Sequence, residues 1–308
     1  MGRKGGRGWK GKRHQHLPRC CVMWCQSSVL FRHDTGIIMK NWDELAAPWL
    51  RAEARIEAAH APVLAALLAA ADLAPGQQVL DVGFGSGLST CQAAAAVGQD
   101  GHVTGVDVAP SFVRRARERV PENVTLIEAD AQTYPFAAAH FDRVISLFGV
   151  MFFDDTVAAF ANIRRAVTPG GLFTMAAWAP PATNPWISVG GQVAHNVLGP
   201  VENRPDPNVP NPFRFAVPGV ALDALTEAGW QAEVETLDMT LTPTGTPDDL
   251  ALTQMELGLA ARRIADEDPD AEDIEALRSG LADRFATMQN ASGAVLVPAR
   301  IHIFSARA

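Results

Sequence analysis

The sequence is poor in cysteine and has no apolar run of membrane-spanning length. Of its four cysteines, Cys20, Cys21 and Cys25 lie near the N-terminus, and only Cys91 lies in the rest of the 308 residues. A single thiol cannot form a disulfide within that remainder, which is typical of a reducing compartment. The most apolar run, residues 61–71, is about half the roughly 20 residues that a transmembrane helix needs. We therefore expect a cytoplasmic protein without a membrane span.

Lysine is almost absent after residue 38, and this change in composition marks a boundary. Three of the four lysines lie in residues 1–38, together with five arginines and a single acidic residue. Because the whole chain has 26 basic and 34 acidic residues, residues 39–308 carry 18 basic and 33 acidic ones. Such an acidic body repels a phosphate backbone, which argues against nucleic acid as a partner. We expect an unstructured basic leader at 1–38, either a targeting segment or an upstream extension, and one domain at 39–308.

No metal site is expected. The leader has His14 and His16 near its cysteines, but Cys20 and Cys21 are adjacent and do not form the spaced pairs of a zinc finger.

The domain alternates strand and helix patterns. After an amphipathic helical region at 41–73, we predict strands at 78–82, 102–107, 124–128, 141–146, 171–178, 232–241 and 295–305. Helices of about ten residues follow the first, second and fourth of these strands, which is typical of parallel βαβ units. The last two strands can pair as an antiparallel hairpin. The fold class is therefore α/β, with a mostly parallel seven-stranded sheet.

Two segments do not fit this alternation and are predicted to form a lid. Residues 179–218 are rich in Pro and Asn around one helix near 189–198, and residues 246–289 are a helical insertion. Both insert where they can cover the carboxyl ends of the parallel strands, the place where open α/β sheets bind ligands.

A glycine-rich loop follows the first strand, with Gly83, Gly85 and Gly87 in alternate positions. Glycines allow unusual φ angles and a close approach of backbone N–H groups to a ligand. The dinucleotide fingerprint needs a third glycine at position 88, which is Leu88, and the phosphate loop needs a lysine that is missing here. Both phosphate-binding motifs therefore lack a defining residue.

The pattern acidic-x-Gly-x-Gly-x-Gly resembles motif I of the class I S-adenosylmethionine-dependent methyltransferases. The resemblance continues through Gly105-Val-Asp107-Val, Glu128-Ala-Asp130-Ala131 and the stretch from Ser146 to Gly171. It covers about residues 42–186 and is strongest for bacterial small-molecule enzymes related to the ubiquinone and menaquinone C-methyltransferases. It implies a doubly wound, Rossmann-like sheet and S-adenosylmethionine as the methyl donor.

The residue types suit that ligand, which has hydroxyl groups and an ammonium group but no phosphate. We interpret Asp81 as positioning the loop or the methionine ammonium, and Asp107 as binding the ribose. Asp81 and Asp130 have the alternative of only capping a turn. Val108 would pack on the adenine, and Asp130 with the Ala131 N–H would contact the adenine edge. The full set of predicted cofactor-binding residues is Asp81, Gly83, Gly85, Gly87, Asp107, Val108, Asp130, Ala131 and Ser146.

Methyl transfer from a sulfonium needs positioning more than a dedicated catalytic residue. If a base is used, His195 in the first lid segment is a candidate, although it has the alternative of packing or facing solvent. Asp154 or Asp155 is expected to cap the following helix. Trp42 and Trp49 either close over the cofactor or pack in the core.

Two other functions stay open: a nicotinamide-dependent oxidoreductase on a similar sheet, and a non-catalytic protein that binds S-adenosylmethionine. For the methyltransferase we expect a small, largely hydrophobic, neutral or cationic acceptor. Its pocket would have an apolar floor made by Phe148, Met151, Phe152 and Phe153. Packing in the core explains some of these residues equally well. The oligomeric state is not indicated.

Overall fold

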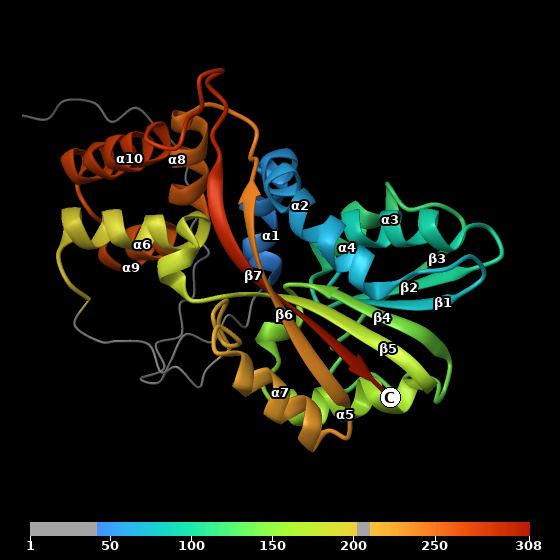
Figure 1. Ribbon diagram of the computed structural model, residues 1–308. Coiled ribbons are helices and arrows are strands. Elements are labelled where there is room, and N and C mark those ends of the chain that lie inside the picture. Colours follow the sequence, from blue (N-terminus) through green and yellow to red (C-terminus); the bar gives the residue numbers. More distant parts are fainter. Residues whose placement is uncertain (1–41, 202–209) are drawn as a thin grey trace, which may run out of the picture. The chain divides into compact units, whose positions relative to one another are not determined.

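A computed structural model of the chain describes residues 42–201 and 210–308, which form a seven-stranded sheet with helices on both faces (Figure 1). The strand order is β3-β2-β1-β4-β5-β7-β6. Strands β1 to β5 are parallel, and β7 runs antiparallel to both β5 and β6. The predicted fold class is confirmed, and the predicted leader at 1–38 lies outside the described residues.

Seven strands were predicted, and all seven are found among the residues that the structure describes. Strand β5 begins four residues earlier than predicted, at Val167, and β7 begins and ends two residues later, at Val297 and Arg307. The central strand β1 is a short apolar run that is buried on both faces, as parallel strands usually are. The outer strand β6 instead alternates exposed and half-buried residues, and its exposed acidic residues protect an open sheet edge. The strands are β1 (Gln78–Val82), β2 (His102–Asp107), β3 (Val124–Glu128), β4 (Phe141–Leu147), β5 (Val167–Trp178), β6 (Gln231–Leu241) and β7 (Val297–Arg307).

Several helices in the described part of the chain begin at a proline, which tolerates the first helical turn because its missing N–H would have no partner there. One of them, α6, was predicted from residue 189 and begins four residues earlier, at Pro185. The helices are α1 (Trp42–Arg51), α2 (Glu53–Ala71), α3 (Leu88–Val97), α4 (Pro110–Arg117), α5 (Thr156–Ala166), α6 (Pro185–Leu198), α7 (Pro218–Glu227), α8 (Pro247–Glu256), α9 (Leu259–Glu267) and α10 (Ala271–Ala286), with short 3-10 turns η1 (Val150–Phe152) and η2 (Pro181–Thr183).

The main core lies between the sheet and these helices. Helices α2, α3 and α4 cover one face of the sheet, and α5 and α7 cover the other (Figure 1). On the second face, Phe160 of α5 packs edge-on against Phe173 of β5, with 5.7 Å between the ring centroids. The indole N–H of Trp230 donates to the Phe160 carbonyl at 3.0 Å, so this polar group is paired within the core.

The antiparallel hairpin extends past the carboxyl ends of the parallel strands. Trp178, the last residue of β5, pairs with Ile301, but β6 and β7 continue to pair from Asp238↔Arg300 to Leu241↔Val297. Both predicted lid segments therefore leave the sheet at this edge. Within them α6, α8, α9 and α10 pack on one another, where the Gln254 amide donates to the Trp186 carbonyl at 2.9 Å. That they act as a lid stays a prediction.

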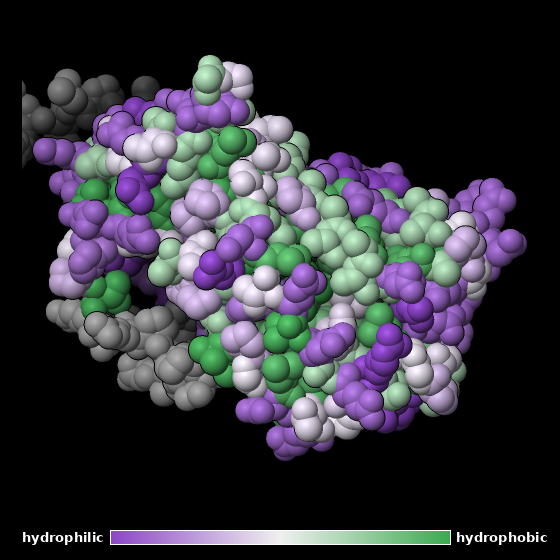
Figure 2. Space-filling view, in the orientation of Figure 1, coloured by the Kyte–Doolittle hydropathy of each residue, from purple (hydrophilic) through white to green (hydrophobic). Residues whose placement is uncertain are grey.

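Helix α2 is long and apolar enough, by length and composition alone, to cross a membrane. In the structure it lies on the sheet and contacts β4, β5, β6 and β7, as the core helix of a globular domain does. The space-filling view shows polar and apolar residues interspersed over the face that carries α2 and β6 (Figure 2).

Candidate active site

The glycine loop connects β1 to α3 and is held against the end of β2. All three of its glycines have positive φ angles, +73° at Gly83, +56° at Gly85 and +93° at Gly87. The N–H of Gly83 donates to the Val106 carbonyl at 2.8 Å, and the N–H of Gly85 donates to Asp107 Oδ2 at 2.8 Å. The backbone at these positions is left-handed, a conformation that residues with a side chain mostly avoid, so the loop needs its glycines.

Asp81 is completely buried beneath this loop. One carboxylate oxygen, Oδ2, accepts hydrogen bonds from the hydroxyl groups of Ser89 and Thr90, each at 2.7 Å. The other, Oδ1, is buried and has no hydrogen-bond partner. Burial raises the pKa of Asp81 to about 6, although both hydroxyl groups act in the opposite direction. Asp81 therefore positions the start of α3 and keeps one acceptor atom unused.

The raised pKa of Asp81 predicts a pH dependence of stability. The folded protein binds this proton more tightly than the unfolded chain, because the pKa is about 6 when folded and 3.8 when exposed. The stabilisation from this group is therefore complete below pH 3.8 and is lost as pH rises to about 6. At pH 7 we expect the melting temperature of Asp81→Asn to be close to that of wild type or above it. At pH 4.5 we expect it to lie lower, compared with wild type, than it does at pH 7. Melting curves at both pH values test this, and a difference between the two proteins that is independent of pH would contradict it.

Asp107 ends β2 and is nearly as buried as Asp81. Its Oδ1 accepts from the Ala109 N–H at 2.9 Å, and its Oδ2 holds Gly85 as described. Burial raises the pKa of this carboxyl group, and the backbone N–H groups lower it. A carboxylate has about four acceptor positions, so Asp107 can still accept from ligand hydroxyl groups. The neighbouring Val108 side chain is 51% exposed, which is unusual for valine and leaves an apolar surface beside the loop.

Asp130 and Ala131 follow the third strand at the same edge. Asp130 is exposed, and its Oδ1 accepts from the Gln132 N–H at 2.8 Å. It therefore caps a turn, which was the alternative to its predicted role in cofactor binding. Ala131 is buried, and its carbonyl accepts from the Asn162 amide at 3.0 Å. Their roles at an adenine ring stay predictions.

Ser146 lies near the carboxyl end of β4, next to the end of β1. It is fully buried, and its hydroxyl group donates to the Val82 carbonyl at 2.8 Å, so it links the two strand ends. Next to it the backbones of Gly83 and Gly149 approach so closely that a Cβ on Gly83 would lie 2.8 Å from Gly149 Cα. The sequence interpretation overlooked Gly149, whose signal was a glycine just after a strand. Contact of Ser146 with a cofactor stays a prediction.

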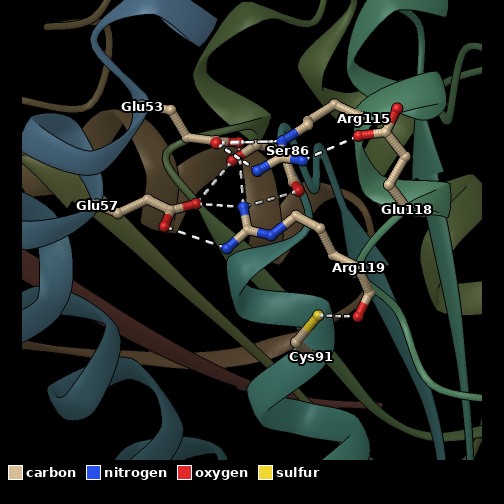
Figure 3. Close-up of polar contacts among 7 residues, drawn as sticks. All are labelled: Glu53, Glu57, Ser86, Cys91, Arg115, Glu118 and Arg119. Atoms are coloured by element: carbon tan, nitrogen blue, oxygen red, sulfur yellow. Dashed lines mark hydrogen bonds and ion pairs between the residues drawn. The ribbon is translucent and has the colours of Figure 1, made fainter.

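A cluster of four charged side chains holds the glycine loop through hydrogen bonds to Ser86 (Figure 3). Arg119 donates to Glu57, to Glu53 at 3.1 Å and to the Ser86 carbonyl at 3.2 Å. The Ser86 hydroxyl group donates to Glu57 at 3.0 Å, and Arg115 forms a bidentate pair with Glu53, from Nε to Oε1 at 3.0 Å and from Nη2 to Oε2 at 2.8 Å. This Arg115 interaction lowers the pKa of Glu53. The loop clamp, defined as Glu53, Glu57, Arg115 and Arg119 around Ser86, joins α2 to α4 across the loop, and nothing in the sequence marked it.

Helix α1 crosses the same edge. Trp42 packs edge-on against Phe152 with centroids 4.6 Å apart, and Trp49 packs against Phe112 at 6.0 Å. Asp43 accepts from the Ser111 N–H at the start of α4 at 2.7 Å. Because Phe112 follows β2 and Phe152 follows β4, α1 bridges the two sides of the glycine loop.

His195 lies in the last turn of α6 and is exposed, which favours the alternative that it faces solvent. Asp155 accepts from the Ala158 N–H at 2.9 Å, which confirms the predicted helix cap. A hollow of about 370 Å³ beside Asp155 is lined also by Arg214 and Phe215 and includes no residue of the glycine loop. Within residues 42–201 and 210–308 no group of three or more His, Cys, Asp or Glu side chains is placed to hold a metal ion.

The sequence of this edge of the sheet is similar to a described family of domains. Residues 79–171, from β1 into β5, match a family model described as a methyltransferase domain.

Two curated relatives match a similar part of the chain. Aklanonic acid methyltransferase DauC of Streptomyces is 38% identical over 100 residues, which are 31% of this chain and 46% of that protein. The ubiquinone/menaquinone biosynthesis C-methyltransferase UbiE of Shewanella piezotolerans is 35% identical over 102 residues, which are 32% of this chain and 41% of that protein. The matches therefore span less than half the length of either relative.

The fold as a whole is similar to solved structures. The YcgJ protein of Bacillus subtilis superimposes with a TM-score of 0.50 over 80% of this chain and 98% of that one, at 16% sequence identity.

Proposed function

We propose that this protein, whose residues 79–171 match a family model described as a methyltransferase domain, transfers a methyl group from S-adenosylmethionine to a small organic acceptor and releases S-adenosylhomocysteine. The observation that carries the proposal is a loop of three left-handed glycines held between two buried carboxylates, Asp81 and Asp107. When bound, the donor supplies an electrophilic methyl group on a positively charged sulfur.

The residues of the loop edge fit this donor. Asp81 Oδ1 is an unused anionic acceptor, which suits an ammonium group, and Asp107 retains capacity to accept from hydroxyl groups. A Cβ built on Gly85 meets no atom within 4 Å, so the loop faces open space there. The exposed Val108 side chain can pack on a flat base. Asp130 and Ala131 are then beside the adenine, and Ser146 with Gly149 sets the spacing between the strand ends.

The nicotinamide-dependent oxidoreductase is not favoured. A dinucleotide needs its third glycine where β1 meets the helix, and that position is Leu88, the first residue of α3. The non-catalytic alternative predicts binding of S-adenosylmethionine without turnover, which an activity screen distinguishes.

The acceptor is proposed to be a small, mainly hydrophobic molecule that is neutral or cationic. The names of the two relatives mention aklanonic acid and the biosynthesis of ubiquinone and menaquinone, which supports an organic acceptor but does not bear on its charge. The net charge of −8 supports the exclusion of nucleic acid, and we propose that the protein acts in the cytoplasm.

Replacing Asp107 by alanine is expected to weaken cofactor binding by about 10- to 150-fold, which corresponds to losing hydrogen bonds to a charged group worth roughly 1.5–3 kcal/mol. Calorimetry with S-adenosylhomocysteine measures the affinity, and radiolabelled S-adenosylmethionine with a panel of small acceptors measures transfer. Asp238→Ala, which removes an exposed carboxylate paired with Arg300 on β7, is the control and should bind like wild type. If wild type gave no binding heat, the proposal would be wrong.

A further inference from the structure

Two buried histidines differ in how their ring nitrogens are paired. His302 is 4% exposed; its Nδ1 lies 2.8 Å from the Thr236 hydroxyl group and its Nε2 lies 3.2 Å from the Ala216 carbonyl. His60 on α2 is 8% exposed, and its Nε2 is buried without a hydrogen-bond partner. Folded proteins pair nearly all their buried polar atoms, so an unpaired ring nitrogen calls for a functional explanation.

Aromatic rings from three other parts of the chain surround His60. Its ring centroid lies 5.2 Å from that of Phe148, 5.8 Å from that of Trp178 and 6.1 Å from that of Trp49. Phe148 and Trp178 stack face to face at 4.3 Å, and they follow and end the neighbouring strands β4 and β5. Phe148 has a φ of +65°, a conformation that costs energy for a residue other than glycine and that tends to occur at functional sites.

The sheet order separates this aromatic group from the carboxylates of the cofactor site. Asp81, Asp107 and Asp130 belong to the side of the sheet formed by β1, β2 and β3, whereas His60 contacts the ends of β4 and β5. Ligands of doubly wound sheets bind where the connections diverge to opposite sides, which here is between β1 and β4. The aromatic group therefore lies on the side left for the second substrate, and both helical insertions leave the sheet from that side.

The surroundings of His60 favour an uncharged ligand with a hydroxyl group. Burial alone lowers the pKa of His60 to about 4, so its ring is neutral at pH 7, and no charged group contributes to the shift. A neutral ring nitrogen donates or accepts according to its tautomer, and a hydroxyl group can match either one. A charged group placed among these rings would be desolvated without a partner.

The geometry points to His60 as an acceptor-binding residue, which makes a hydrogen bond through Nε2 to a hydroxyl group of an uncharged, planar acceptor packed against Phe148 and Trp178. This inference rests on the proposed function, because it is the cofactor assignment that leaves the ends of β4 and β5 for the acceptor. It also explains why α2 carries a histidine among rings where an apolar residue would avoid an unpaired nitrogen.

The test compares two probes of similar shape, 2-naphthol and 2-methylnaphthalene, in the presence of S-adenosylhomocysteine. Wild type should bind 2-naphthol about 10-fold more tightly, as expected for one hydrogen bond to a buried group, and His60→Leu should abolish that preference while keeping its affinity for 2-methylnaphthalene. His60→Gln places an amide near the position of Nε2 and should restore part of the preference. In protein labelled with ¹⁵N-histidine, 2-naphthol should shift the His60 ring signals and 2-methylnaphthalene should shift them much less.

Stability separates this role from a packing role. His60→Leu removes an unpaired nitrogen and should melt at or above the wild-type temperature, whereas the control His302→Leu removes two hydrogen bonds of a buried ring, with Thr236 and with Ala216, and should melt lower without changing either affinity. The inference is overturned if His60→Leu keeps the preference for 2-naphthol, or if neither probe binds to wild type that does bind S-adenosylhomocysteine. Loss of S-adenosylhomocysteine binding in wild type would instead overturn the proposed function.

Discussion

Gly85→Val will abolish binding of S-adenosylhomocysteine, with affinity falling by more than about 100-fold, because the new side chain occupies the space of the ligand. A Cβ at residue 85 meets no protein atom within 4 Å, so the added group projects into the open space above the loop. The φ of +56° adds strain, but the fold itself is not sterically blocked. Calorimetry measures the lost affinity, and circular dichroism should show a folded protein.

Gly83→Ala is the matched control within the same loop. Here a Cβ would lie 2.8 Å from Gly149 Cα, a backbone atom that cannot move away cheaply. We expect a large fall in melting temperature for Gly83→Ala, which adds this clash to the strain of a positive φ, and a smaller fall for Gly85→Val, which has the backbone strain alone. The assignment of Gly85 to the ligand site is wrong if Gly85→Val binds normally, or if it unfolds as readily as Gly83→Ala.

The sheet could be predicted from the sequence because its signals are local. A strand such as 78–82 is a short, largely apolar segment between a Pro-Gly turn and the glycine loop, and the structure places β1 at Gln78–Val82. The helix before β1 was predictable from its apolar spacing. Helix α6 begins at Pro185, four residues before its predicted start. The residues around Pro185 have an irregular pattern that hides the helix, although proline is typical of a first helical turn.

The candidate site was predicted only where its residues are near one another in the sequence. Asp81 and the three glycines lie within seven residues, and their pattern carries the family resemblance. Glu57 and Arg119 are 62 residues apart, and His60 meets Phe148 only after α2 packs on the sheet. Such contacts depend on tertiary packing, which a single sequence does not reveal. The turn-capping role of Asp130 was foreseen as an alternative, and the structure contains it.

The loop clamp is expected to matter for both stability and cofactor binding. Arg119 is the only one of its members that contacts both glutamates and the Ser86 backbone, and its side chain is 21% exposed. Ser86 lies between Gly85 and Gly87, so its carbonyl and hydroxyl group transmit the position of α2 to the loop.

Arg119→Met should therefore destabilise the protein by about 3 kcal/mol, in the range found when one partner of a largely buried ion pair is removed, because Glu57 keeps its charge and loses its main partner. For a domain of this size that is a fall in melting temperature of roughly 6–12 °C. Affinity for S-adenosylhomocysteine should fall as well, since the loop loses its link to α2. The matched control is Arg278→Met, whose pairs with Glu275 and Asp248 lie on exposed helix surfaces and should contribute less than about 1 kcal/mol. Adding Glu57→Gln to Arg119→Met should recover part of the stability, because it removes the uncompensated charge. Equal melting temperatures for the Arg119→Met and Arg278→Met proteins would show that the clamp does not hold the loop.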